Sequence, residues 1–342
     1  MRYVRRSASN GRWSQMTDVC NVGDEEGASS SGGHSKPMLT VEQQIAHMKS
    51  KGITFDLVSE EDAVAHLRTK CQFFRVYSYR KLFPKYVGGP HDGRYVKLDF
   101  GHLKTLSNLD RQLRDILLAM TLDIEHFAKV RLLSAAEDHG EDGYAIMRAY
   151  HASLPKNDRS RIEGELKKRR NDHYAGGVVR KYLGDMPIWA FCEVVPFGIF
   201  ADLVRFCAAR WGDKDLRDVH YQLKNSRQIR NAGAHGACIL NDVASPSPSK
   251  RSPAVLVNAM NALGIPKRLR SKWFRSRRMV QICSLLYLFS QIVPKGEVRS
   301  DRKATLMELF AEVDACGLPP ENPSMAALLF LKRLTSSLGL LD

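Results

Sequence analysis

The most constraining feature of this sequence is a helical repeat of apolar residues between Asn108 and Glu137. Apolar side chains recur there at spacings of three and four residues, which places them on one face of an α-helix. These positions are Leu109, Leu113, Ile116, Leu117, Met120, Ile124 and Phe127. At about 1.5 Å per residue the helix is roughly 45 Å long. We therefore expect it to form the central helix of a bundle.

Helical signals occur on both sides of this stretch, as capping boxes, apolar faces and prolines at first turns. The aromatic residues of QFFRVYSYRKLFP are interpreted as packing between helices rather than stacking on bases, and KYVGGPHDGRY reads as a loop or short hairpin. The fold class predicted is all-α. The expected helices cover 41–51, 59–71, 108–137, 215–235, 279–292 and 304–314, and others open at Pro187 and Pro196.

Three regions differ in composition. Residues 1–35 are rich in serine, glycine and charge, so we expect a disordered tail, and Met16 leaves a later start open. Residues 36–245 are expected to form a helical domain. Residues 246–342 form a helical C-terminal extension, either a separate domain or packed onto the bundle.

The chain contains 52 basic and 37 acidic residues, a net charge of +15. Such an excess points to a polyanionic partner, with nucleic acid first and a merely cationic surface as the alternative. The apolar stretches are too short or too interrupted to span a bilayer. Seven cysteines without CxxC spacing and a start without an apolar h-region favour a soluble, cytoplasmic protein.

A basic run at 267–278 is the strongest local charge feature. It has seven basic residues and no acidic one, and on a helix it can follow phosphates while an aromatic residue stacks on a base or anchors in the core. A solvated helix face with a buried tryptophan is the alternative. The candidate RNA-binding residues are Lys267, Arg268, Arg270, Lys272, Trp273, Arg275, Arg277 and Arg278.

The string RNAGAH places Arg230, Asn231 and His235 at the end of a predicted helix. At about 100° per residue, Asn231 and His235 share a face, whereas Arg230 lies about 140° from His235. A single ideal helix therefore cannot bring the arginine and the imidazole together. Either the helix loosens at Gly233, or two copies of the motif face each other across a dimer, which we favour.

This cluster suits RNA cleavage by attack of the 2′-hydroxyl on the adjacent phosphate. His235 would act as general acid or base, since imidazole titrates near pH 6.5. Arg230 would stabilise the charge on the phosphorane, and Asn231 would orient the ring or the phosphate. No metal-ligand pattern is present in the sequence, and we expect no metal and no cofactor.

Two carboxylates in apolar surroundings, Glu125 and Glu193, are candidate supporting residues because an unpaired buried carboxylate is costly. One of them would pair with Arg230 and hold it toward the site. The alternative is that each binds an ordinary backbone or helix-end group, which we favour for Glu193.

From about Lys36 to Asn241 the chain resembles the Abi-like family of abortive-infection proteins, the AbiD and AbiF group of the HEPN superfamily. Five landmarks carry the resemblance: KPMLTVEQQIAHMKSKGI, QFFRVYSY, LDRQLRDILL followed by Glu125, PIWAFCEVVPFG, and RNAGAH. The chain departs from the family where Gly236 stands in place of a common second histidine.

The resemblance implies a HEPN-like helical bundle that dimerises across an RNxxxH motif formed by Arg230, Asn231 and His235. It also implies a metal-independent endoribonuclease of antiphage, toxin type, with RNA as substrate and a small non-coding RNA as regulator. The alternative is a non-catalytic HEPN protein that sequesters RNA, or a purely structural interaction protein.

Overall fold

A computed structural model describes residues 38–247 and 252–342. The expected tail at 1–35 and part of the serine-proline stretch before Ala254 lie outside the described residues. The chain divides into Met1–Thr40 and a second unit, Val41–Asp342, which is described below.

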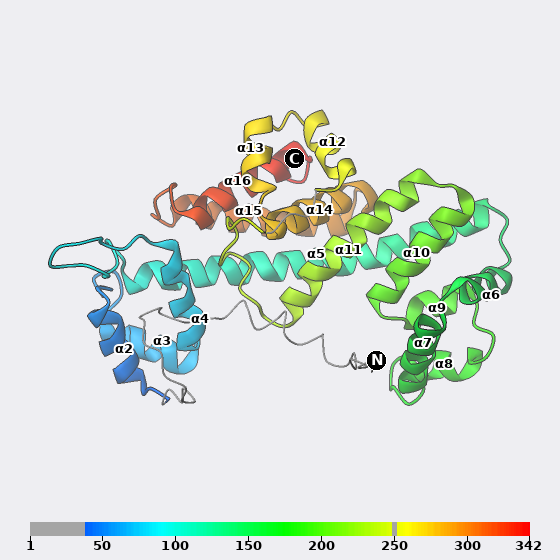
Figure 1. Ribbon diagram of the computed structural model, residues 1–342, viewed down its shortest axis with the longest axis horizontal. Helices are drawn as coiled ribbons and strands as arrows, with labels where there is room; N and C mark the ends of the chain where they lie inside the picture. The colour runs from blue at the N-terminus through cyan, green and yellow to red at the C-terminus, as the bar shows by residue number, and fades with distance from the viewer. Residues whose placement is uncertain (1–37, 248–251) are drawn as a thin grey trace, which may run out of the picture. The chain divides into compact units, whose positions relative to one another are not determined.

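The described part of the chain contains fifteen α-helices, one 3-10 helix (η2) and no strand, which confirms the all-α prediction (Figure 1). Its β-type pairing is limited to two isolated bridges. The helices are α2 (Val41–Ser50), α3 (Glu60–Thr69), α4 (Phe73–Ser78), η2 (Tyr79–Leu82), α5 (Phe100–Asp138), α6 (Gly143–Ser153), α7 (Lys156–Arg169), α8 (Gly176–Tyr182), α9 (Ile188–Val194), α10 (Phe197–Trp211), α11 (Lys214–Ala234), α12 (Ala254–Ala262), α13 (Lys267–Trp273), α14 (Arg277–Ile292), α15 (Glu297–Ala315) and α16 (Pro323–Ser337).

The long helix α5 is the central element, as predicted, and it begins eight residues earlier than its apolar repeat indicated. Asp99 caps its N-terminus, because its side chain accepts a hydrogen bond from the Gly101 backbone N–H in a capping box with His102. The apolar face extends back into this first part, where Leu103 and Leu106 are fully buried. The cap, rather than the start of the apolar repeat, therefore determines where α5 begins.

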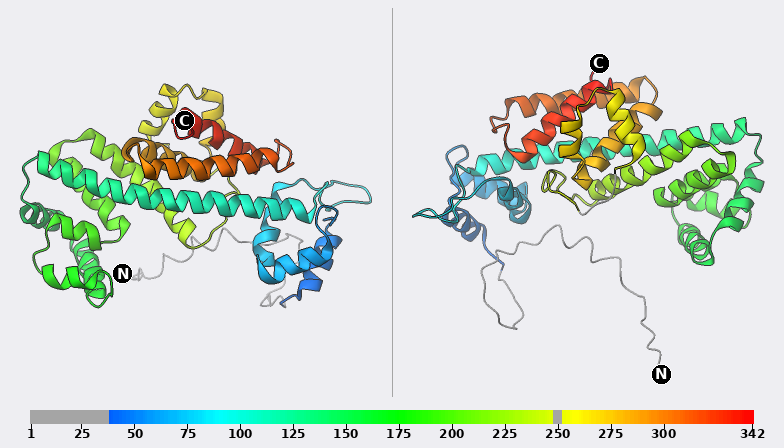
Figure 2. Two further views of the ribbon diagram at one scale, coloured as in Figure 1. Left: turned by 180° about the vertical axis from the view of Figure 1, so that it is seen from behind. Right: turned by 45° about the horizontal axis from the view of Figure 1, so that its top comes forward.

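Helices from distant parts of the sequence pack on α5. Helix α4 contacts its first half and α9 its second half, while α11, α14 and α15 pack along it (Figures 1 and 2). Helix α11 lies between α10 and α14, so its C-terminal half is supported on several sides. The predicted helix at 215–235 is confirmed, and Asp213 caps it by accepting from the Leu216 N–H.

The C-terminal extension shares the core of the bundle. Helix α14 packs on both α5 and α11, and its Leu285 and Phe289 belong to the same buried apolar cluster as Leu117 of α5. The Ser324 hydroxyl of α16 donates to the Leu240 carbonyl. Residues 252–342 therefore pack onto the bundle within the unit Val41–Asp342.

The aromatic stretch is mainly structural. Tyr77 and Tyr79 are buried, and Phe73 stacks on Tyr77, which confirms packing for these rings, whereas Phe74 is 43% exposed. The segment after the aromatic stretch forms a short hairpin closed by the Lys85–Tyr95 bridge, as expected.

None of the helices in the described residues combines the length and the hydrophobicity that spanning a bilayer requires.

Candidate functional site

The RNAGAH segment lies at the C-terminal end of α11. The helix continues without interruption to Ala234, and the His235 backbone N–H donates a 3.1 Å hydrogen bond to the Asn231 carbonyl oxygen. Gly233 is buried, and a Cβ there would lie 3.3 Å from the Cβ of Leu118 on α5. The helix therefore does not loosen at Gly233, and the glycine instead allows α11 to approach α5 closely.

The three candidate catalytic side chains are accessible. His235 is exposed, and Arg230 and Asn231 are half-buried. None of the three side chains has a hydrogen bond or an ion pair with another described residue. Five residues of regular helix still separate Arg230 from His235 by about 140°, so the two groups face different directions within one chain.

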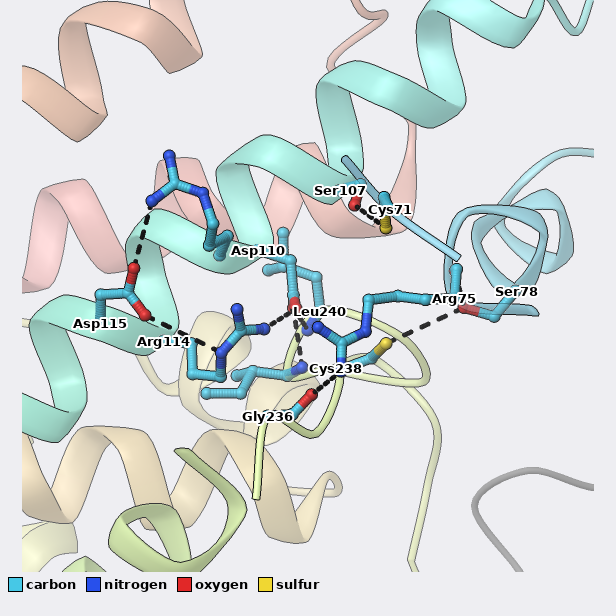
Figure 3. Close-up of polar contacts among 12 residues, drawn as sticks. Cys71, Arg75, Ser78, Ser107, Asp110, Arg114, Asp115, Gly236, Cys238 and Leu240 are labelled. Atoms are coloured by element: carbon cyan, nitrogen blue, oxygen red, sulfur yellow. Dashed lines mark hydrogen bonds and ion pairs between the residues drawn. The ribbon is translucent and has the colours of Figure 1, made fainter. Parts of the chain in front are cut away.

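The residue that follows His235 is held by a helix from the N-terminal part of the chain. Gly236 has φ 64°, a left-handed conformation that ends α11. Its carbonyl oxygen accepts a 2.6 Å hydrogen bond from Nη2 of Arg75 on α4 (Figure 3). The end of the motif is therefore tied to α4.

A buried carboxylate anchors the next residues to α5. Asp110 is fully buried, and its Oδ1 accepts hydrogen bonds from the backbone N–H groups of Ile239 at 2.7 Å and Leu240 at 2.5 Å (Figure 3). Its Oδ2 accepts a 3.2 Å hydrogen bond from Nη1 of Arg114, one turn further along α5. Burial raises the pKa of Asp110, and the Leu240 N–H and Arg114 oppose that rise.

The same segment is bound from α14. Arg278 donates from Nη1 to the carbonyl oxygens of Cys238 and Ile239 at 3.3 and 3.4 Å. Three helices, α4, α5 and α14, thus supply arginines or a carboxylate to the backbone of 236–240. We refer to Arg75, Asp110, Arg114 and Arg278 as the anchor cluster. It fixes the position of the chain directly behind His235.

Sequence reasoning missed three members of the anchor cluster and assigned the fourth, Arg278, to RNA. One signal was available: Asp110 and Arg114 follow Leu109 and Leu113 within the apolar repeat, at positions where a buried charge needs a partner. Besides Arg114, the partners of Asp110 are backbone groups about 130 residues later, which no local pattern indicates.

The two supporting carboxylates lie elsewhere than expected. Glu125 forms an ion pair with Lys129 of its own helix, with Oε1 and Nζ 3.5 Å apart, and not with Arg230. Glu193 is exposed. The expectation that apolar surroundings bury Glu193 is therefore wrong, because α9 turns this side chain outward while Phe191, Cys192 and Val194 enter the core.

The basic run divides between two helices, α13 and the start of α14. Arg270 and Arg278 are half-buried and bind backbone carbonyls. Trp273 is 2% exposed and stacks on Phe330 of α16. It is therefore a core residue and cannot stack on a base, which corrects its assignment to RNA binding. The exposed members are Lys267, Arg268, Lys272, Arg275 and Arg277.

The start of α14 lies beside the motif segment, because Arg278 bonds to Cys238 and Ile239. The exposed cations Arg275 and Arg277 are close to Arg278 in the sequence.

The described residues contain no group of three or more His, Cys, Asp or Glu side chains placed to hold a metal ion.

Comparison with known proteins gave a family match. A family model described as Abi-like protein matches residues 66–241, about half of the chain. The matched region runs from the end of α3 to Asn241 and so contains α5, α11, the RNAGAH segment and all of the anchor cluster except Arg278. Neither the curated proteins nor the solved structures contain a significant match.

Proposed function

The chain belongs to the Abi-like protein family, and from this premise we propose that it is a metal-independent endoribonuclease of the abortive-infection class, acting in the cytoplasm. One observation carries the proposal. An uninterrupted helix presents Arg230, Asn231 and His235 free of partners among the described residues, on a segment anchored to the core. Accessible polar side chains on a rigid support are typical of a catalytic site.

In the proposed reaction the RNA 2′-hydroxyl attacks the adjacent phosphorus. The O2′–P bond forms, the P–O5′ bond breaks, and the products are a 2′,3′-cyclic phosphate and a 5′-hydroxyl end. His235 of one copy takes the 2′-hydroxyl proton, and a protonated His235, of the same or the second copy, gives a proton to the leaving 5′-oxygen. Arg230 neutralises the charge that develops on the phosphorane oxygens, and Asn231, one turn before His235, orients the ring or the phosphate.

The site is completed by a second copy of the chain. Within one copy the helix keeps Arg230 and His235 about 140° apart, so a homodimer that brings two motifs together supplies both groups to one phosphate. A face suited to this contact begins next to the motif. A Cβ at Gly233 would lie 3.3 Å from the Cβ of Leu118 on α5. Leu122 and Val130, further along α5, are 52% and 51% exposed. We propose these two exposed apolar side chains as part of the contact face between the two copies.

The RNA strand is held by the exposed cations of α13 and the start of α14, which neutralise phosphates. The anchor residue Arg278 places the start of α14 beside the motif segment, so a strand bound there passes close to His235. The same strand contact allows a regulatory non-coding RNA to occupy the site.

The test compares wild type, His235→Ala and His173→Ala on total RNA in EDTA, with the new ends mapped. His173 is also exposed and lies outside the motif, so it is a matched control. We expect 2′,3′-cyclic phosphate ends from wild type and His173→Ala only. Cleavage by His235→Ala, or loss of wild-type cleavage in EDTA, would contradict the mechanism. RNA binding without cleavage by wild type would favour a non-catalytic RNA-binding protein.

The dimer is tested separately with Leu122→Asp, which places a charge on the proposed contact face. We expect wild type to be dimeric by light scattering and Leu122→Asp to be monomeric, folded and inactive. A monomeric wild type with full activity would contradict the composite site.

A further inference from the structure

A polar pocket of about 220 Å³ lies at the N-terminal half of α11, away from the RNAGAH segment. Four helices contribute to it: α5, α11, α12 and α14. Val219, Val255 and Leu288 form its apolar lining. Its polar residues are Arg131, Asp215, Asp218, Gln222, Tyr287 and Gln291.

Gln222 is the residue that indicates a ligand. It is 1% exposed, and neither its amide nitrogen nor its amide oxygen has a hydrogen-bond partner among the described residues. A buried amide that lacks partners is costly and rare in folded proteins. Asp215, Asp218 and Arg131 also form no hydrogen bond or ion pair with another described residue. The pocket therefore offers one unpartnered amide, two carboxylates and a guanidinium that form no hydrogen bond or ion pair within the described residues.

The charges restrict what can bind. A phosphate or carboxylate would gain from Arg131 but would be repelled by Asp215 and Asp218. A polyamine would gain from the two aspartates but would be repelled by Arg131. The fitting ligand is therefore neutral, with N–H donors for the carboxylates, an acceptor for the guanidinium, and an adjacent donor and acceptor for the Gln222 amide.

We propose that this pocket binds a nucleobase, and guanine before the others. Guanine carries N–H donors at N1 and N2 beside acceptors at O6 and N7, so it can satisfy the aspartates, Arg131 and Gln222 together. Adenine, cytosine and uracil offer fewer donors to the two carboxylates. Unpaired bases are read by proteins through hydrogen bonds to these edges.

Two features agree with this assignment. Burial and the negative charges of Asp218 and Asp215 raise the pKa of Tyr287, so its hydroxyl stays protonated and can donate to a base. The pocket is also smaller than the roughly 300–1,000 Å³ of sites for drug-sized ligands, which suits one base. The base that binds in the pocket belongs either to an RNA strand or to a free nucleoside.

The proposal that the bound base belongs to an RNA strand rests on the proposed function. The proposal that the pocket binds a base does not. Gln222 precedes Arg230 by eight residues on α11, about 12 Å along the helix axis. A strand at the motif can therefore place a nearby base in the pocket, and the pocket then selects which RNA is held.

The experiment measures binding of guanosine, adenosine, cytidine and uridine to the full-length protein by calorimetry. Gln222→Met removes the amide at similar volume, and Gln228→Met changes an exposed glutamine of the same helix as the control. We expect guanosine to bind wild type and Gln228→Met best, and binding to Gln222→Met to be about tenfold weaker. We expect Gln222→Met to melt no lower than wild type, because it loses only an unpartnered amide.

Asp218→Asn provides a second variant if Gln222→Met fails to fold, and it should also weaken guanosine binding. Absence of nucleoside binding at millimolar concentration, or equal binding by Gln222→Met, would overturn the site. Equal binding of all four nucleosides would overturn the guanine assignment.

Competition with a 2′-O-methyl oligonucleotide that contains one guanosine distinguishes the sources. Displacement of guanosine indicates a strand base, and failure to displace indicates a free nucleoside. Each binding measurement is repeated with the His235→Ala variant. Guanosine binding by this variant does not depend on RNA cleavage, so the base site is tested separately from the proposed function.

Discussion

Arg75 of α4 donates a 2.6 Å hydrogen bond to the carbonyl oxygen of Gly236, a residue 161 positions later in the chain. Gly236 directly follows His235 and ends α11 in a left-handed conformation with φ 64°. A Cβ at this position would lie 3.1 Å from the same Arg75 nitrogen. The backbone directly after the candidate catalytic histidine is therefore held by a contact with α4, in the N-terminal part of the bundle.

The first prediction concerns Gly236→Ala. Alanine at positive φ is strained, so we expect a loss of about 1–2 kcal/mol in the free energy of unfolding. Gly264→Ala is the matched control, since Gly264 has φ 67° and open space around its Cβ direction. Gly236→Ala should lose at least as much stability as Gly264→Ala in urea unfolding, and only Gly236→Ala should lose RNA cleavage. Equal cleavage by the two variants would show that the Arg75 contact does not position His235.

The second prediction concerns Asp110→Ala. This variant leaves the N–H groups of Ile239 and Leu240 and the buried Arg114 without their acceptor. Breaking such a buried pair costs about 3–5 kcal/mol, which chemical denaturation will measure. Asp110→Asn keeps an oxygen for the two N–H groups, so it should lose less stability. If Asp110→Ala unfolds like wild type, the anchor cluster does not hold this segment.

The third prediction concerns Trp273→Ala, which separates core packing from RNA binding. Trp273 is buried against Phe330, so we expect a loss of about 3–5 kcal/mol in stability. The conservative Trp273→Phe variant should stay folded and bind RNA as wild type does in a filter-binding assay. Weakened RNA binding by a fully folded Trp273→Phe would indicate that Trp273 stacks on an RNA base.

The fourth prediction concerns the exposed cations of the basic run. Replacing Lys267, Arg268 and Arg275 by alanine should weaken RNA binding and reduce the salt dependence of the affinity. For single strands the slope of log affinity against log salt changes by about 0.7 for each phosphate that the protein no longer neutralises. The control replaces the exposed Lys167 and Lys168 of α7, which should leave the slope near its wild-type value.

The fifth prediction concerns acid pH. Burial lowers the pKa of His66, with Lys104 and Lys70 adding to the effect, and burial likewise lowers the pKa of His151 and His220. The unfolded chain then binds protons that the folded chain does not. Stability is therefore full above about pH 6.5 and declines as pH falls below it.

His66→Leu removes one of these groups, and both ring nitrogens of His66 have no hydrogen-bond partner among the described residues. We expect its free energy of unfolding to fall less than that of wild type between pH 7.5 and pH 5. Parallel pH profiles for the two proteins would contradict this account.

The order and type of the elements were largely predictable, because they depend on local signals. Apolar spacing predicted α5, helices were also expected at α11 and α14, and the prolines at 187 and 196 open α9 and α10 where expected. The candidate catalytic residues, Arg230, Asn231 and His235, were also identified from their own segment. Each of these inferences needs only neighbours within a few residues.

Sequence alone thus determined an all-α chain that carries its candidate motif at the end of one helix. Tertiary structure decided which side chains are buried or paired within the protein and which stay exposed. It buried Trp273, paired Glu125 with Lys129 and turned Glu193 outward. It also brought Asp110 to backbone groups 129 and 130 residues away. These outcomes depend on which helices pack together, and packing selects partners by burial and distance rather than by position in the chain.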